Sequence, residues 1–255
     1  MKKLLWTGGW DSTFRLLQLA HSGNIIQPHY IRDTKRDSLK KELKTMDEIR
    51  TKVNKSFPES FVREIEVINQ TDIIEYPEFS LAYKNLLSKG WLGSQYVHIA
   101  SYCKQKQVKG MELSIERARD KSRVRFTNIP CLENTEIDSD GNRVISKRSD
   151  EDLLCLYGQF SFPILSLTKL DMLEESKKLG FADLLNITWF CHQPLFGKPC
   201  GSCNPCMSTL EEGLEYRFST LSRTNYRLKK MIISNKKLHR FLKRLKYGVN
   251  DYSSR

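Results

Sequence analysis

Two adjacent glycines, Gly8 and Gly9, limit the folds open to this chain, because they separate a strand-like segment from a helix-like one. Residues 2–6, KKLLW, are typical of a short strand. Residues 11–23, DSTFRLLQLAHSG, have helical periodicity and end at Gly23, which we expect as the C-cap. Glycine permits a sharp turn whose N–H groups converge at the positive end of the following helix. The turn is therefore predicted to bind an anion.

The alternation of strand and helix continues along the chain. The segments expected as strands are 24–33, 61–68 and 110–116, and those expected as helices are 38–57, 96–107 and 168–180. Thr168 and Gly180 are the expected caps of the last helix. The polar stretch 134–152 is expected as a loop with one weak hairpin near Asp140 and Gly141. This order predicts an α/β protein with a doubly wound, mostly parallel sheet, whose ligand site lies beyond the carboxyl ends of the strands.

Length and hydropathy bound the class of protein. The chain has 255 residues, enough for one sizeable α/β domain with an appendage. No apolar run approaches the roughly 20 residues that cross a bilayer, and the first residues do not form a signal peptide. We therefore expect a cytoplasmic protein with no membrane span.

The positive charge of the chain is concentrated near its end. The formal net charge is +12, and residues 207–255 hold 12 Lys and Arg against 4 Asp and Glu. Such a field attracts polyanions such as nucleic acid, nucleotides or acidic partners. Within it, an expected helix has one apolar face, formed by Leu238, Phe241, Leu242 and Leu245. That face is expected to dock on the domain or on a second subunit in a homodimer, and a solvated basic helix is the alternative.

Four of the seven cysteines are crowded into 16 residues with metal-ligand spacing. Cys191, Cys200, Cys203 and Cys206 are separated by eight, two and two residues, among glycines and prolines that form tight turns. Four thiolates close a tetrahedral shell, so we predict a structural Zn²⁺ site. An iron–sulfur cluster and four unbound thiols are the alternatives. The remaining cysteines, Cys103, Cys131 and Cys155, have no such spacing.

The glycine turn matches neither common nucleotide-binding loop, since no lysine follows it and the G-x-G-x-x-G pattern is absent. The run from Thr7 through Gly8, Gly9 and Asp11 to Ser12 instead resembles the S-G-G-x-D-S loop of the PP-loop ATP pyrophosphatases. That resemblance implies that these residues, with Thr13, hold the pyrophosphate end of ATP, with Asp11 near the phosphates and Mg²⁺. The alternative is an ordinary strand-to-helix turn in which Asp11 is the N-cap.

The second half of the chain narrows the resemblance. The segment from Phe162 to Cys206 is similar to the C-terminal half of the 7-cyano-7-deazaguanine synthases, and the likeness extends from Leu4 to about Leu214. The residues that correspond to the motifs of that family are Pro163, Lys169, Thr188, Cys191, Cys200, Cys203 and Cys206. The resemblance implies that Lys169 faces the phosphates of ATP and that the cysteines complete a zinc site.

The resemblance also implies a fold and a reaction. The fold would be the adenine nucleotide alpha hydrolase-like (HUP) fold of PP-loop enzymes in residues 1–185, followed by a zinc-binding segment with basic helices in residues 186–255. Asp11, Ser12 and Lys169 would be the catalytic residues. The enzyme would adenylate 7-carboxy-7-deazaguanine with ATP and use ammonia to form 7-cyano-7-deazaguanine.

Three alternatives remain open at this point. The chain departs from the family at Gly93, Ser94 and Gln95, and at residues 114–123, SIERARDKSR, where the family has an acidic stretch. Glu116 and the cations from Arg117 to Arg125 suit a different acceptor of the adenylated deazapurine, in a defence or polysaccharide pathway. A tRNA-modifying PP-loop enzyme and a non-enzymatic zinc-ribbon adaptor for nucleic acid are the others, both favoured by the basic tail.

Overall fold

The computed structural model describes residues 1–34, 37–89, 93–117, 134–139 and 141–235. The chain divides into two compact units, Met1–Phe190 and Cys191–Arg255, and each is described by itself. The sequence analysis places the division after residue 185, within helix α8 (Ala182–Asn186). The expected apolar helix face from Leu238 to Leu245 lies outside the described residues.

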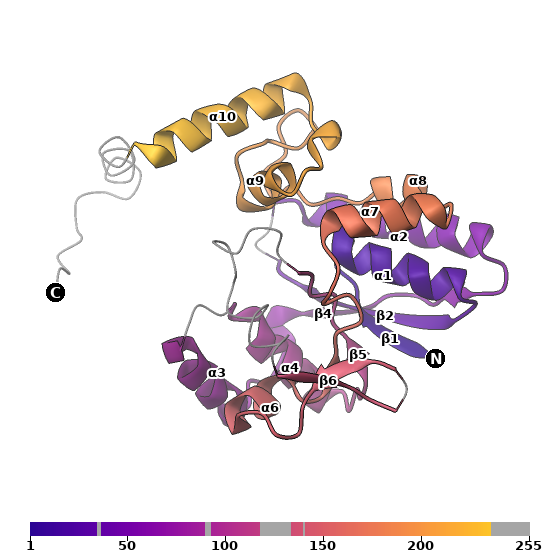
Figure 1. The fold of residues 1–255 in the computed structure, drawn as a ribbon, viewed down its shortest axis with the longest axis vertical. Coiled ribbons are helices and arrows are strands. Elements are labelled where there is room, and N and C mark those ends of the chain that lie inside the picture. The colour runs from indigo at the N-terminus through magenta and orange to yellow at the C-terminus, as the bar shows by residue number, and fades with distance from the viewer. Residues whose placement is uncertain (35–36, 90–92, 118–133, 140, 236–255) are drawn as a thin grey trace. The chain divides into compact units, whose positions relative to one another are not determined.

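The first unit is built on a mostly parallel sheet, as the sequence predicts (Figure 1). Strand β1 (Lys2–Leu5) pairs in parallel with β2 on one side and with β5 on the other. The spatial order of the strands is β3 (Phe61–Val62), β2 (Ile25–Arg32), β1, β5 (Met111–Glu112), β8 (Phe160–Ser161), β7 (Arg143–Ile145) and β6 (Thr135–Ile137). The hairpin of β6 and β7 is antiparallel and confirms the hairpin expected near Gly141.

The single strand expected over residues 61–68 is divided in two. Strand β3 pairs with the start of β2, and β4 (Glu66–Asn69) pairs with its end, from His29 onward. Pro28 stands between the two paired stretches of β2 and has no backbone N–H to donate. The side chain of Gln27 donates instead to the carbonyl of Glu64 at 2.9 Å. The break therefore has a local cause that the alternating apolar pattern does not reveal.

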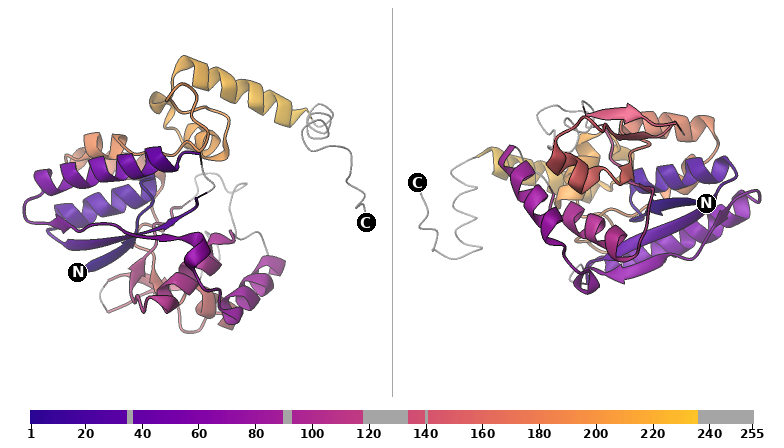
Figure 2. Two further views of the ribbon diagram at one scale, coloured as in Figure 1. Left: turned by 180° about the vertical axis from the view of Figure 1, so that it is seen from behind. Right: turned by 90° about the horizontal axis from the view of Figure 1, so that it is seen from below.

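Helices cover both faces of the sheet (Figure 2). Helices α1 (Trp10–His21), α2 (Leu39–Ser56), α7 (Lys169–Lys178) and α8 lie on one face, and α3 (Pro77–Lys89), α4 (Gln95–Gln105) and α6 (Glu151–Tyr157) on the other. Apolar side chains fill the space on each side. Phe14 of α1 packs on Phe181 with 6.0 Å between ring centroids, and Tyr96 of α4 packs on Tyr157 at 4.9 Å. This confirms the doubly wound arrangement.

The N-cap of α7 is Thr168, as the sequence predicts, whereas the C-cap is Leu179, one residue before the expected Gly180. Thr168 and Asp171 form a reciprocal capping box at its start, and Gly180 follows its end with φ of +77°. The capping box therefore fixes the start of the helix at Lys169, after the turn residues 162–168 that follow β8. That start brings Lys169 to the carboxyl edge of β8.

The second unit begins with the cysteine-rich loop. The loop leads into α9 (Asn204–Glu211), a short 3₁₀ turn (Glu215–Arg217) and α10 (Thr220–Ser234). Within the part of the chain described here, no helix has both the length and the apolar character needed to span a membrane.

Candidate functional site

The glycine turn joins β1 to α1 in a conformation that requires glycine. Gly8 has φ of +70°, and a Cβ added there would lie 2.6 Å from Cγ of Met46. Gly9 is the N-cap of α1, whose start has no side-chain cap. The interpretation of Asp11 as the N-cap is therefore wrong, because the helix already begins at Trp10. Among the described residues no side chain caps this helix start, an arrangement that suits an anion.

Hydroxyl groups brace the turn from within. The Ser12 hydroxyl accepts a hydrogen bond from the backbone N–H of Thr7 at 3.2 Å, and the two hydroxyls are 3.1 Å apart. Thr13, predicted to bind the cofactor, is fully buried, and its hydroxyl accepts from Nε1 of Trp6 at 2.9 Å. Thr7 is exposed at the mouth of the turn. The structure thus places Thr7 toward solvent and Thr13 within the core.

The segment after α8 is attached to the same turn. The backbone N–H of Trp189 donates to the carbonyl of Gly8 at 3.2 Å, and the ammonium of Lys41 lies 5.2 Å from the centroid of the Trp189 ring. The neighbouring Thr188 is buried, and its hydroxyl donates to the carbonyl of Leu185 at 2.8 Å. Thr188 therefore binds back to the last turn of α8, which ends at Asn186, and Trp189 holds the glycine turn in place.

Lys169 meets two carboxylates at the carboxyl edge of the sheet. Its ammonium lies 3.1 Å from Oδ1 of Asp11 and forms an ion pair and a hydrogen bond with Glu116. The side chain of Lys169 is only 9% exposed, and those of Asp11 and Glu116 are 28% and 18% exposed. Three groups separated by more than 50 residues in sequence therefore form one charged cluster, which we call the Lys169 cluster.

The strand order explains this meeting. Asp11, Glu116 and Lys169 follow β1, β5 and β8, which are neighbours in the sheet. The chain leaves β1 toward β2, whereas β5 lies on the opposite side, so the point between β1 and β5 is the topological switch point. Ligands of open α/β sheets bind in the crevice at such a point. The predicted ligand edge is thus occupied by a glycine turn, a lysine and two carboxylates.

A buried ion pair joins α1 to β5. Nε and Nη2 of Arg15 donate to the two carboxylate oxygens of Glu112, at 2.7 and 3.1 Å. Glu112 is 3% exposed, so the two-point contact with the arginine compensates its negative charge where water has little access. Because Glu112 ends β5 and Arg15 belongs to α1, the pair fixes the helix against the strand. Sequence analysis missed both residues.

Glu116 has a more specific position than sequence analysis gave it. The pattern groups it with the cations of a surface stretch, whereas in the structure it contacts Lys169. Arg117 is about half exposed and lies 3.6 Å from Asp171. The other cations of that stretch, Arg119, Lys121, Arg123 and Arg125, lie outside the described residues. Glu116 is the last residue of the strand predicted over 110–116, of which only Met111–Glu112 forms β5, and that position at a strand end is the signal that could have indicated its place.

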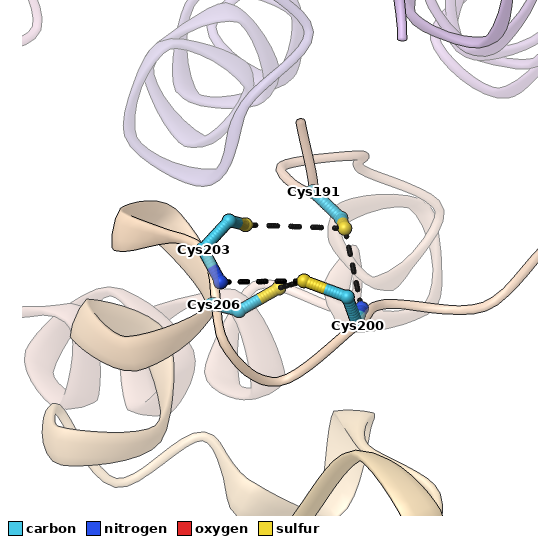
Figure 3. Close-up of side chains that lie close together, drawn as sticks. All are labelled: Cys191, Cys200, Cys203 and Cys206. Carbon is cyan, nitrogen blue, oxygen red and sulfur yellow. Dashed lines mark hydrogen bonds between the residues drawn. The ribbon is translucent and has the colours of Figure 1, made fainter. Parts of the chain in front are cut away.

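The second unit contains the predicted four-cysteine cluster (Figure 3). The sulfurs of Cys191, Cys200, Cys203 and Cys206 lie within 4.8 Å of one another. The Cys200 to Cys206 and Cys191 to Cys203 sulfur distances are 3.9 and 4.0 Å. Tetrahedral zinc thiolates require about 3.8 Å between sulfurs, whereas a disulfide requires about 2.0 Å. The cluster can hold one metal ion such as zinc.

Backbone groups orient the sulfurs. The N–H of Cys200 donates to Sγ of Cys191 at 3.2 Å, and the N–H of Cys203 donates to Sγ of Cys200 at 3.3 Å. Gly201 has φ of +80°, and a Cβ there would lie 1.8 Å from the carbonyl oxygen of Ser222. A side chain at this position would collide with the backbone of α10, so the loop packs directly against that helix. Asn225 of α10 also donates to the carbonyl of Cys200 at 3.1 Å.

The sulfurs of the cluster influence one another's ionisation. Hydrogen bonding with the thiols of Cys191 and Cys206 holds the pKa of Cys203 well below its usual range. Hydrogen bonding with Cys203 raises the pKa of Cys191 to about 12. One thiolate is therefore stabilised at the expense of its neighbours, and a bound cation would favour ionisation of the others.

The cysteines outside the cluster have a different character. Cys103 is 2% exposed, and burial raises its pKa to about 12, as expected for a small core side chain. Cys155 is partly buried against the core cluster of α3, α4 and α6. Cys131 lies outside the described residues. Neither described residue has the environment of an activated nucleophile.

Comparison with protein-family models and with curated proteins finds no match to the chain. What the structure defines is an α/β protein with a mostly parallel sheet and a four-cysteine cluster near its C-terminus.

Proposed function

We propose that the chain is an AMP-forming, ATP-dependent enzyme of the PP-loop type. The observation that supports this most is the approach of the Lys169 ammonium to Asp11, 3.1 Å away, beside the uncapped start of α1. A lysine, a glycine turn and a helix start at one edge suit the binding of a polyphosphate. The motif residues Thr7, Gly8, Gly9 and Ser12 belong to that turn.

Each residue has a role in this proposal. The N–H groups of the turn bind the pyrophosphate end of ATP, and Lys169 neutralises the charge that develops as pyrophosphate leaves. Oxygen ligands are those that Mg²⁺ prefers, and Asp11 and Glu116 supply them. Bound there, Mg²⁺ would withdraw charge from the phosphates. Ser12 and Thr13 hold the turn in shape through their contacts with Thr7 and Trp6.

The substrate we propose is 7-carboxy-7-deazaguanine with ammonia. A carboxylate resists ammonia because it is negatively charged and has a poor leaving group. Its oxygen attacks the α-phosphorus of ATP, and pyrophosphate departs. Ammonia then displaces AMP and loses a proton, which gives the amide. A second ATP adenylates the amide oxygen with release of pyrophosphate, and loss of AMP and of both amide protons gives the nitrile. Orientation and charge stabilisation are sufficient for these steps, with no side-chain nucleophile.

The metal of the second unit is proposed as structural Zn²⁺. Four thiolates fill a tetrahedral shell and leave no position for substrate. The bonds from Ser222 and Asn225 to Pro199 and Cys200 connect the cluster to α10, so the ion would fix that helix. Binding of zinc would therefore stabilise the fold of this unit.

A different acceptor of the adenylated compound is the second candidate, and the basic helix favours it. Helix α10 has the exposed cations Arg223, Arg227 and Lys229 and no acidic residue. This surface suits a polyanionic partner such as a nucleic acid or an acidic protein tail. A tRNA-modifying enzyme and a nucleic-acid adaptor would use the same surface. The adaptor alone predicts salt-dependent binding without ATP turnover.

The test is to incubate the pure protein with ATP, Mg²⁺, ammonium and 7-carboxy-7-deazaguanine, and to resolve the products by liquid chromatography with mass detection. AMP with the nitrile supports the proposal. AMP with a deazapurine adduct supports the second candidate. Absence of AMP with 7-carboxy-7-deazaguanine contradicts both. We expect the Lys169→Met variant to be inactive. Lys177→Met is its control, because Lys177 is exposed near the end of the same helix.

A further inference from the structure

The second unit exposes a phenylalanine at the tip of a tight hairpin. Two backbone hydrogen bonds of 2.9 and 3.0 Å join Leu195 to Lys198, and Phe196 and Gly197 form the turn between them. Both turn residues are left-handed, with φ of +49° and +74°, a conformation that favours Asn followed by Gly. Phe196 is therefore unfavourable for the turn itself, yet its side chain is 88% exposed. Such a residue points to a contact outside the fold.

Helix α10 has an apolar stripe that the cysteine-rich loop leaves uncovered. Ser222 and Asn225 attach the helix to that loop by hydrogen bonds to its carbonyls. Leu221, Leu228 and Met231 lie beside this attached face, at positions that share one side of a helix. They are 51%, 50% and 59% exposed. We call these three residues the α10 stripe.

Cations border both apolar features. Arg223 and Arg227 are exposed one turn apart on the flank of the α10 stripe, and the helix has no acidic residue. In the hairpin, the exposed Lys198 is two residues from Phe196. Exposed apolar side chains with adjacent cations suit a partner that is anionic at its surface and apolar beneath it.

We propose that the second unit binds the surface of an anionic lipid bilayer. Phe196 and the α10 stripe enter the interface between headgroups and acyl chains, and Arg223, Arg227 and Lys198 pair with lipid phosphates. The inference goes beyond the proposed function and does not depend on it, because ATP turnover requires no lipid.

Other partners would use only part of this surface. A nucleic acid would pair with the cations and stack on Phe196, but it would gain little from the aliphatic side chains of the α10 stripe. A second copy would bring Arg223 and Arg227 near their own kind, with no carboxylate on α10 to compensate them. An amphipathic peptide helix docks in a groove, whereas Phe196 projects from a turn tip.

Net charge alone makes a different prediction. A chain with a formal net charge of +12 is attracted to any anionic vesicle. If charge were the whole cause, substitutions that keep the charge and remove an exposed apolar side chain would leave binding unchanged. Uncharged substitutions at Phe196 and Leu228 therefore separate the two accounts.

The experiment measures co-sedimentation of the zinc-loaded full chain with phosphatidylcholine vesicles, with and without phosphatidylglycerol, at physiological salt. We expect wild type to bind only the vesicles that contain phosphatidylglycerol. Phe196→Asn and Leu228→Gln should each weaken this binding about tenfold, because each removes an apolar side chain from the interface. Arg223→Gln with Arg227→Gln should weaken it by about fivefold for each cation.

Matched variants in the first unit are the controls. Leu81→Gln removes a leucine that is 60% exposed on α3, and Lys44→Gln with Lys84→Gln removes the same charge as the double arginine variant. Both should bind as wild type does. Because Asn suits the left-handed turn, Phe196→Asn should keep the thermal stability and zinc content of wild type, so its loss of binding is not a loss of fold.

Three outcomes overturn the inference and leave the proposed function standing. The first is equal vesicle binding by wild type, Phe196→Asn and Leu228→Gln. The second is absence of wild-type binding to phosphatidylglycerol vesicles together with binding of a single-stranded oligonucleotide that Phe196→Asn weakens, which would assign the surface to nucleic acid. The third is the same absence together with a dimer in light scattering that Leu228→Gln dissociates, which would assign the surface to a second copy.

Discussion

The two candidate sites of this molecule depend on different levels of structure, one on local sequence spacing and the other on the order of strands in the sheet. The four cysteines lie within 16 residues and need only a tight loop to meet. The Lys169 cluster draws on residues 11, 116 and 169, which meet only because β1, β5 and β8 are neighbours. A local site depends on spacing and on its ion, whereas a distributed site depends on the whole sheet. We therefore predict that a substitution that disrupts one site leaves the other site intact.

Loss of the metal site should have the largest effect. Cys206→Ala removes a fully buried ligand, and structural zinc contributes about 10–16 kcal/mol of apparent binding energy in zinc-finger peptides. We expect α9 and α10 to lose protection from hydrogen exchange, while β1 and α1 keep theirs. Hydrogen exchange with mass detection, together with zinc content, measures this. Cys155→Ala is the control, and unchanged protection of α10 would contradict a structural metal.

Loss of the lysine should have the next largest effect. Lys169→Met leaves Asp11 and Glu116 facing each other without the ammonium, and it removes a cation at the proposed phosphate site. We expect kcat/KM for ATP to fall by about 100-fold or more, which is about 2.7 kcal/mol. Steady-state kinetics of AMP release test this against Lys177→Met. Equal activity of the two variants would show that Lys169 has no role at the proposed phosphate site.

A change in the conformation of the glycine turn should have a smaller effect, which we expect in the free energy of unfolding. Gly8→Ala adds a Cβ 2.6 Å from Met46 at φ of +70°, and we expect a loss of about 2 kcal/mol or more in the free energy of unfolding. Gly180→Ala is the matched variant, because its φ is +77° with no atom within 4 Å. It should lose only about 1 kcal/mol. Equal losses in urea titrations would show that the contact with Met46 has no role.

The smallest effect should be a pH dependence from His29. This residue is 2% exposed in β2, and its Nδ1 lies 2.7 Å from the Tyr102 hydroxyl and 3.4 Å from Glu66. Burial lowers its pKa below 6.5 despite Glu66, so the unfolded chain binds the proton first. Stability should therefore fall as pH drops below about 6.5, by at most about 1.4 kcal/mol per pH unit. His29→Gln should flatten this slope in urea titrations, and His21→Gln should retain it.

The local features of the fold could be predicted from the sequence. The strand, glycine turn and helix from residue 2 to 23, the capping of α7 by Thr168 and the cysteine cluster all follow from spacing and residue type. Each involves contacts within one short segment. The division of the neighbouring strand into β3 and β4 could also be expected from the missing N–H of Pro28, although the alternating pattern after residue 60 concealed it.

The contacts between distant segments could not be predicted. Strands β5 and β8 are only two residues long, so periodicity cannot place β5 beside β1 or β8 beside β5. The contact of Glu116 with Lys169 and the pairing of Arg15 with Glu112 both depend on that order. The burial of Thr13 likewise follows from the side of α1 that faces Trp6. Strand order is a property of the whole chain, which motif spacing does not contain.

The central claim is that the Lys169 cluster and its glycine turn activate a carboxylate by adenylation. The most direct measurement uses 7-carboxy-7-deazaguanine labelled with oxygen-18 in its carboxylate, with ATP, Mg²⁺ and ammonium, and follows the label by mass spectrometry. Attack of the carboxylate on the α-phosphorus transfers one labelled oxygen to AMP, and we predict this in wild type but not in Lys169→Met. AMP that forms without the label, or ADP in its place, would contradict the account.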